Sequence, residues 1–68
     1  MHIMVNGKEK TYEKSGVSVH ELLSLEEVIS PEMVTVQLNG KFLLHKQFHD
    51  TTIDDGDKVE FLYFLEGG

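Results

Sequence analysis

Residues 18–25 read Ser-Val-His-Glu-Leu-Leu-Ser-Leu, and this stretch decides the fold because it carries the helical pattern of the chain. Ser18 and Glu21 have the spacing of a capping box, in which the Ser18 hydroxyl accepts a hydrogen bond from the Glu21 amide. The Glu21 carboxylate is then expected to reach back to the Ser18 amide. Val17 and Leu22 stand at the positions of a hydrophobic staple. The pattern predicts that a helix begins here.

The helix must end before Pro31, because proline disfavours the helical conformation in the residue that precedes it. Apolar residues continue through Leu25 toward Val28, so we predict a helix of about three turns. Glu26 and Glu27 are expected to face outward.

A β-hairpin is predicted on the N-terminal side of the helix. Residues 2–6 alternate, with Ile3 and Val5 on one face. Asn6-Gly7 follows, and both residues accept the positive φ that a type I′ turn requires. Residues 8–12 then form a short polar return strand at a sheet edge.

A second hairpin and a long last strand are predicted on the C-terminal side. Asn39-Gly40 is again a type I′ signal, and it joins an alternating strand at 33–39 to a short strand at 41–44. Phe48 is expected to enter the core from an irregular stretch with a single helical turn. The longest strand-like run, residues 58–65, follows an Asp-rich turn.

The order β-β-α-β-β-β predicts a mixed sheet with the helix packed on one face. The first and last strands would be parallel neighbours in the centre of the sheet. This is an α+β fold of the β-grasp, ubiquitin-like kind. We expect residues 1–65 to form the β-grasp domain and residues 66–68 to form a flexible C-terminal tail.

The composition excludes several classes of function. The 68 residues include no cysteine, which excludes a disulfide framework, a Cys-based zinc site and a thiol nucleophile. The net charge of −6 disfavours nucleic acid and favours a basic protein partner. No apolar run approaches a membrane span, and the N-terminus lacks the basic start of a signal peptide. We expect a cytoplasmic protein that is a monomer when free.

The terminal pair Gly67-Gly68, preceded by Glu66, is the most informative feature. A tail without side chains is thin enough to enter a narrow channel and present its α-carboxylate in the active site of another protein. A frayed chain end is the alternative. An ionised carboxylate is a poor electrophile and needs activation, for example by ATP. The chain has no Gly-rich phosphate loop of the GxxxxGK kind, so a partner enzyme would have to activate it.

Other side chains give weaker signals. His45 and His49 have the i,i+4 spacing of a metal-binding pair, but surface histidines explain them better because no third ligand and no sustained helix is evident. Asp54, Asp55 and Asp57 lack the length of a calcium loop and suit a turn. We identify no catalytic constellation, no metal site and no permanently bound cofactor.

The last strand predicts a docking surface. If Glu60 faces water, the two-residue period places Leu62 and Phe64 on the same outer face. Pairing of the first and last strands would then bring Met4 beside Leu62 or Phe64. An exposed Met-Leu-Phe cluster next to the tail is typical of a partner-binding surface. The alternative is that a twist or bulge turns Phe64 into the core.

Several motifs together resemble the ThiS family, the sulfur carriers of thiamine biosynthesis, which are relatives of the small subunit of molybdopterin synthase and of ubiquitin. They cover nearly the whole chain in the family order: Val5-Asn6-Gly7, Val19-His20-Glu21-Leu22-Leu23, Val36-Gln37-Leu38-Asn39-Gly40, Ile53-Asp54-Asp55-Gly56-Asp57-Lys58-Val59-Glu60-Phe61 and Gly67-Gly68. One departure is Leu44-His45, where members of the family often carry Pro-Arg.

The resemblance implies a carrier that is not itself an enzyme. An ATP-dependent activating enzyme would adenylate the carboxylate of Gly68, and a sulfur donor protein would supply the sulfur of a thiocarboxylate. A thiazole synthase would then receive the sulfur. Three alternatives stay open: sulfur donation in molybdopterin synthesis, a ubiquitin-like modifier of lysines, and a binding module with an incidental Gly-Gly end.

Overall fold

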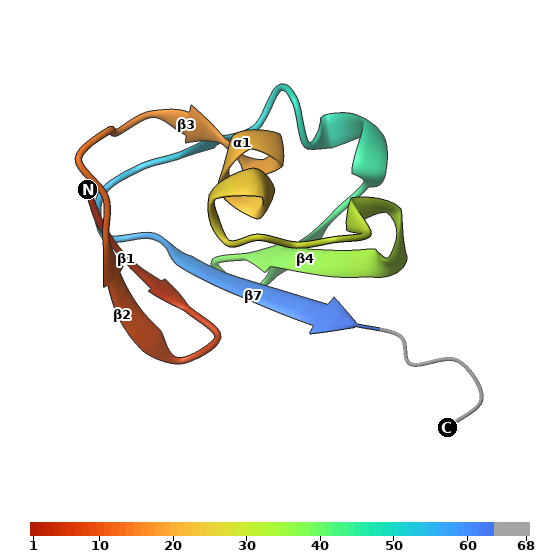
Figure 1. Cartoon of the computed structure of the whole chain (residues 1–68), viewed down its shortest axis with the longest axis horizontal. Helices are drawn as coiled ribbons and strands as arrows, with labels where there is room; N and C mark the ends of the chain where they lie inside the picture. The colour runs from red at the N-terminus through yellow and green to blue at the C-terminus, as the bar shows by residue number, and fades with distance from the viewer. Residues whose placement is uncertain (64–68) are drawn as a thin grey trace.

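The computed structural model describes residues 1–63. Five strands form a mixed sheet in the order β2-β1-β7-β4-β5, and helix α1 packs on one face of it (Figure 1). The strands of this sheet are β1 (His2–Val5), β2 (Lys8–Thr11), β4 (Val34–Leu38), β5 (Lys41–Leu43) and β7 (Lys58–Tyr63). The predicted α+β architecture is confirmed. The predicted domain end at residue 65 and the tail at 66–68 lie outside the described residues.

The two hairpins are joined by the predicted turns. Asn6 and Gly7 have φ values of 51° and 81°, and Asn39 and Gly40 have 52° and 86°. Positive φ at both central residues is what a type I′ turn requires, because its backbone then follows the right-handed twist of the strands. β1 pairs antiparallel with β2, and β4 pairs antiparallel with β5.

The centre of the sheet is the predicted parallel pair of the first and last strands. Met4 lies opposite Lys58 and Val5 opposite Val59. Beyond Val5 and Val59, a side chain replaces the backbone in linking the two segments. Asn6 Oδ1 accepts a 2.7 Å hydrogen bond from the Phe61 amide of β7. On its other edge β7 pairs antiparallel with β4 over five residue pairs.

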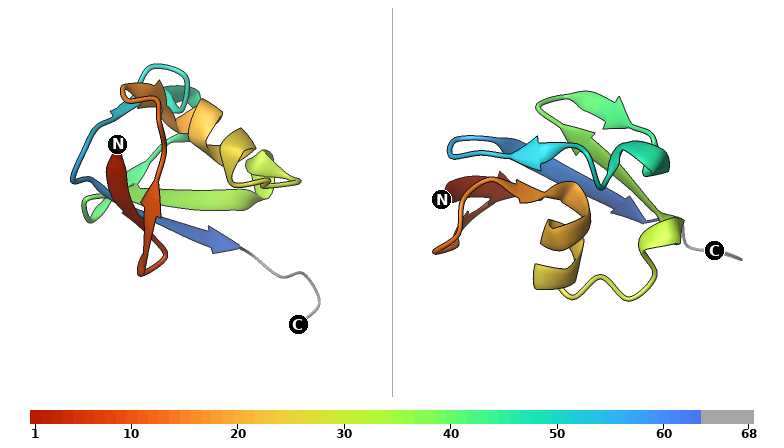
Figure 2. Two further views of the ribbon diagram at one scale, coloured as in Figure 1. Left: turned by 60° about the vertical axis from the view of Figure 1, so that its left-hand side comes forward. Right: turned by 90° about the horizontal axis from the view of Figure 1, so that it is seen from above.

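The remaining elements cover the helix-bearing side of the sheet. Two short strands, β3 (Val17–Ser18) and β6 (Thr52–Ile53), pair antiparallel, and single 3₁₀ turns form η1 (Pro31–Met33) and η2 (His45–Gln47) (Figure 2). Phe48 follows η2 and is buried, as predicted. Among the residues whose burial the structure describes, the core is entirely apolar and consists of Ile3, Val5, Val17, Val19, Leu22, Leu23, Val34, Val36, Phe48, Ile53, Val59 and Phe61.

Helix α1 (Val19–Leu25) begins as predicted but its cap is only half of the predicted capping box. The Glu21 amide donates a 3.0 Å hydrogen bond to Ser18 Oγ. The Glu21 carboxylate does not reach back to Ser18, because it accepts a 2.8 Å hydrogen bond from the Lys14 ammonium. Ser18 instead pairs with Thr52 in the small sheet.

The helix ends earlier than predicted. It has seven residues, which is about two turns, because the chain reverses at Glu27. The Glu27 amide donates to the Ser24 carbonyl at 3.0 Å and the Val28 amide donates to the Leu23 carbonyl at 2.9 Å. These two bonds form a Schellman motif, and they return Val28 to the core.

The prediction that Glu26 faces outward is wrong. Its side chain is only 14% exposed, and its carboxylate lies 3.7 Å from the Lys10 ammonium on strand β2. The early end of the helix places Glu26 at the helix C-cap, next to the first hairpin. The prediction for Glu27 is confirmed, since this residue is exposed.

Glu27 occupies a backbone position that favours glycine, with φ of 60°. We expect Glu27→Gly to raise the free energy of unfolding by about 1 kcal/mol, since glycine carries no Cβ to clash in the left-handed region. Ser24→Gly is the matched control inside α1 and should lower the same quantity by about 0.5 kcal/mol. Urea unfolding of the two variants measures both changes. A loss of stability in Glu27→Gly would show that its side chain, not its backbone, determines the end of the helix.

Candidate functional site

The end of strand β7 is the root of the C-terminal tail. Tyr63, the last described residue, lies opposite Val34 at the start of β4. The 3₁₀ turn η1 immediately precedes Val34, so it lies at the same end of the sheet (Figures 1 and 2). Any protein that binds the tail close to the domain must therefore approach this end of the sheet.

Strand β7 presents its side chains as the alternation predicts. Val59 and Phe61 are buried toward the helix, whereas Leu62 is 46% exposed on the outer face. Leu62 lies opposite Thr35 of β4. Phe64, the third member of the predicted docking surface, lies outside the described residues.

The predicted contact of Met4 with Leu62 is wrong, and the alternative contact with Phe64 lies outside the described residues. Met4 is exposed on the outer face, but it lies opposite Lys58. Leu62 lies four positions after Lys58 along β7, which is a distance of about 13 Å. The physical reason is the parallel pairing: β1 and β7 run in the same direction, and β1 ends at the turn after Val5, near the start of β7. Whether Met4 contacts a partner stays a prediction.

Two other apolar side chains lie on the outer face of the sheet, across β4 from Leu62. Phe42 is 65% exposed and lies opposite Gln37, and Leu44 is exposed immediately after β5. Continuing the same register by one residue places Leu44 opposite Thr35, the neighbour of Leu62. We call Phe42, Leu44 and Leu62 the outer patch. Sequence reasoning missed Phe42 and Leu44, although alternation around the half-buried Leu43 was the signal that could have found them.

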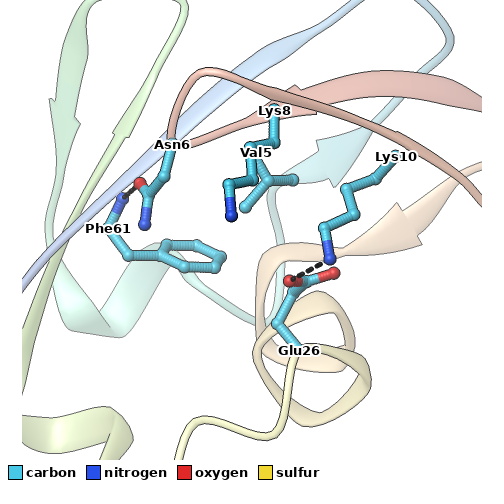
Figure 3. Close-up of a pocket in the computed structure, with 6 residues that line it drawn as sticks. All are labelled: Val5, Asn6, Lys8, Lys10, Glu26 and Phe61. Carbon is cyan, nitrogen blue, oxygen red and sulfur yellow. Dashed lines mark hydrogen bonds and ion pairs between the residues drawn. The ribbon is translucent and has the colours of Figure 1, made fainter.

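A cavity of about 240 Å³ lies between the first hairpin and the end of α1 (Figure 3). Lys10 lies 3.7 Å from Glu26 beside it, and Asn6 Oδ1 accepts a hydrogen bond from the Phe61 amide. Lys8 alone is left to offer a charge. We interpret the cavity as part of the packing between hairpin and helix rather than as a catalytic site.

The histidines are not arranged as metal ligands. His45 Nε2 lies 3.0 Å from the Val34 carbonyl oxygen, whereas His49 stacks on His20 with 4.1 Å between ring centroids. The i,i+4 pair His45 and His49 is thus divided between two environments, because η2 is a single turn. Among residues 1–63, no three His, Asp or Glu side chains come together as a metal-binding group. The Asp-rich turn is held by its own bonds, with the Asp54 amide donating to Asp57 Oδ2 at 2.8 Å.

No helix in the described part of the chain is long and apolar enough to cross a membrane.

The model of the ThiS family matches residues 3–68. The chain belongs to the ThiS family. A crystal structure of a thiamine biosynthesis protein (ThiS) from Geobacter metallireducens is 49% identical, with a TM-score of 0.90 over 100% of both chains. The NMR solution structure of a thiamine biosynthesis protein from the same organism is also 49% identical, with a TM-score of 0.84 over 100% of this chain and 88% of that one. A comparison with curated proteins gives no match.

The departure from the ThiS family pattern at Leu44-His45 has a place in the structure. Leu44 contributes an exposed apolar side chain to the outer patch. His45 begins η2, and its ring contacts both the Val34 carbonyl and the Phe48 ring, with 4.9 Å between the His45 and Phe48 centroids. In this chain, Leu44 thus lies on the surface beside the tail root, and His45 contacts the edge of the core at Phe48.

The outer patch can be distinguished from the core by its effect on stability. Phe42→Ala should change the free energy of unfolding by less than about 1 kcal/mol, since an exposed side chain leaves no cavity. Phe61→Ala, the matched control on the buried face, should cost about 3–5 kcal/mol. Urea unfolding measures both values. A cost for Phe42→Ala equal to that for Phe61→Ala would show that the outer face is packed in solution.

Proposed function

We propose that this chain is a sulfur carrier of thiamine biosynthesis that holds its sulfur at the α-carboxylate of Gly68. The observation that carries the proposal is the ThiS family match, which extends through the terminal pair Gly67-Gly68. Its support is that the crystal and NMR structures at 49% identity are of a thiamine biosynthesis protein from Geobacter metallireducens.

The chemistry begins with activation of a poor electrophile. In the activating enzyme, a Gly68 carboxylate oxygen attacks the α-phosphorus of ATP, and pyrophosphate leaves. The product is an acyl adenylate, whose AMP group can be displaced. A sulfur nucleophile delivered by the donor protein attacks the Gly68 carbonyl carbon, AMP leaves, and a thiocarboxylate remains. A thiazole synthase then accepts the sulfur from this tail.

The roles divide between the carrier and its partners. The carrier supplies an acyl group at the end of a narrow tail, because neither Gly67 nor Gly68 has a side chain to block a channel. The partners supply the ATP site and the catalytic groups. Since the carrier itself is not the catalyst in this scheme, its specificity must come from its docking surface and from the length of its tail.

Two features support docking to a protein partner. The outer patch offers apolar area next to the tail root, which is where a tail-binding partner would contact the domain. The net charge of −6 would speed the encounter with a basic surface. The predicted roles of Leu62 and Phe64 in docking belong to this proposal.

Deletion of Gly68 should abolish activation while the domain stays folded. It shortens the tail by about 3.3–3.6 Å, and misplacement of a reacting group by about 1 Å can already cost a hundredfold in rate. The measurements are ATP–pyrophosphate exchange with the activating enzyme and the intact mass after sulfur loading. Only the wild type should gain the mass difference between one sulfur and one oxygen atom.

A Gly68 carboxamide is the matched control, since it keeps the length of the tail and removes the nucleophilic oxygen. It should also fail to exchange pyrophosphate. Equal activation of the wild type and the shortened chain would contradict the proposal. A covalent adduct to protein lysines in the native cell, in place of a thiocarboxylate, would instead favour the modifier alternative.

A further inference from the structure

A second apolar surface lies on the helix side of the tail root. The end of α1 and the segment that follows it to β4 expose three large apolar side chains, Leu25, Ile29 and Met33. Ile29 is 94% exposed, which is the largest exposure of any large apolar residue among those described. We call these three residues, with Glu27 and Glu32, the connector surface. It is separate from the outer patch, which lies on the opposite face of the sheet.

The backbone of the connector presents Ile29 to solvent at an energetic cost. The Schellman motif turns Val28 inward to the core, so that the next residue points away from it. The turn requires positive φ at Glu27, a conformation that is unfavourable for a residue with a side chain. Strain of this kind is often kept where the side chain has a function. At this position the side chain is an exposed carboxylate.

The charge around the connector surface selects the kind of occupant. Residues 26–33 contain three glutamates and no basic residue. Lys10 neutralises Glu26, whereas none of the ion pairs formed by residues 1–63 includes Glu27 or Glu32. A second copy of this chain would place the same carboxylates against each other, and an anionic lipid surface would repel them. A protein surface with an apolar recess and a rim of Lys or Arg fits both features.

The position of the connector surface beside the tail root indicates that its partner is a protein that binds the tail. Met33 immediately precedes Val34, which lies opposite Tyr63 at the root of the tail (Figure 2). A protein that receives the tail in a channel must place the rim of that channel around this root. We propose that the connector surface is a second docking surface, which seats Ile29 and Met33 in an apolar recess with a basic rim on the activating enzyme, the first partner that binds the tail. This inference rests on the proposed carrier function.

The test is binding of the full-length carrier to the activating enzyme from the same genome, measured by surface plasmon resonance. Ile29→Ser should weaken binding by about tenfold, because it removes an apolar anchor from the interface. Its unfolding curve should match that of the wild type, since Ile29 packs on nothing in the free protein. Equal affinity of Ile29→Ser and wild type would overturn the proposal, while pyrophosphate exchange by both would leave the carrier function intact.

The charges are tested by a pair of double variants with the same net charge. Glu27→Gln with Glu32→Gln should slow association and reduce its dependence on salt, because the steering carboxylates are gone. Glu13→Gln with Asp54→Asn is the control away from the tail root and should leave both quantities near the wild-type values. An equal effect of the two double variants would show that only net charge matters. It would overturn the proposal that Glu27 and Glu32 face a basic rim on the partner.

Two further outcomes would also overturn the proposal that the connector surface docks on the activating enzyme. Sedimentation of a wild-type dimer that becomes a monomer in Ile29→Ser would make the connector an interface between two copies. Binding of the wild type, but not of Ile29→Ser, to vesicles of phosphatidylcholine and phosphatidylglycerol would make it a membrane contact. Absence of both binding and pyrophosphate exchange in the wild type would remove the carrier function and this inference together.

Discussion

The parallel pairing of the first and last strands is the constraint on which the rest of the structure depends. It joins Met4 and Val5 to Lys58 and Val59, near opposite ends of the chain. Such a contact can form only after a long loop has closed, so its entropic cost must be offset by burial of the core. Asn6 extends the pairing with a side-chain hydrogen bond across 55 residues of sequence. One residue thus serves both the type I′ turn and the centre of the sheet.

This pairing also positions the functional end of the molecule. With β7 held between β1 and β4, the chain leaves the sheet beside the start of β4 and beside η1. The outer patch lies on one side of this root and the connector surface on the other. In the proposed carrier scheme, the reacting group would be the Gly68 carboxylate and these two surfaces of the domain would provide recognition. Rigid surfaces suit the task, because they lose little conformational entropy on binding.

Local sequence signals predicted most elements but fewer of their contacts. The capping serine, the two Asn-Gly turns and the buried Phe48 were all predicted from residues close in sequence. Glu26 was not, because its environment depends on Lys10 of another element. The end of α1 was also misjudged. A Schellman turn usually carries glycine at the position that Glu27 occupies, so its sequence signal was absent.

The sequence by itself determined the order of the helix and the five strands of the main sheet, the inward and outward faces of β1, β4 and β7, and the terminal Gly-Gly pair. These follow from periods of two and of 3.6 residues and from turn chemistry, which act over a few residues. Only the tertiary structure decided that Met4 lies beside Lys58, far from Leu62, and that Phe42 joins Leu62 on the outer face. Register between distant strands is set by how all the side chains fill one core together, and no local pattern contains that information.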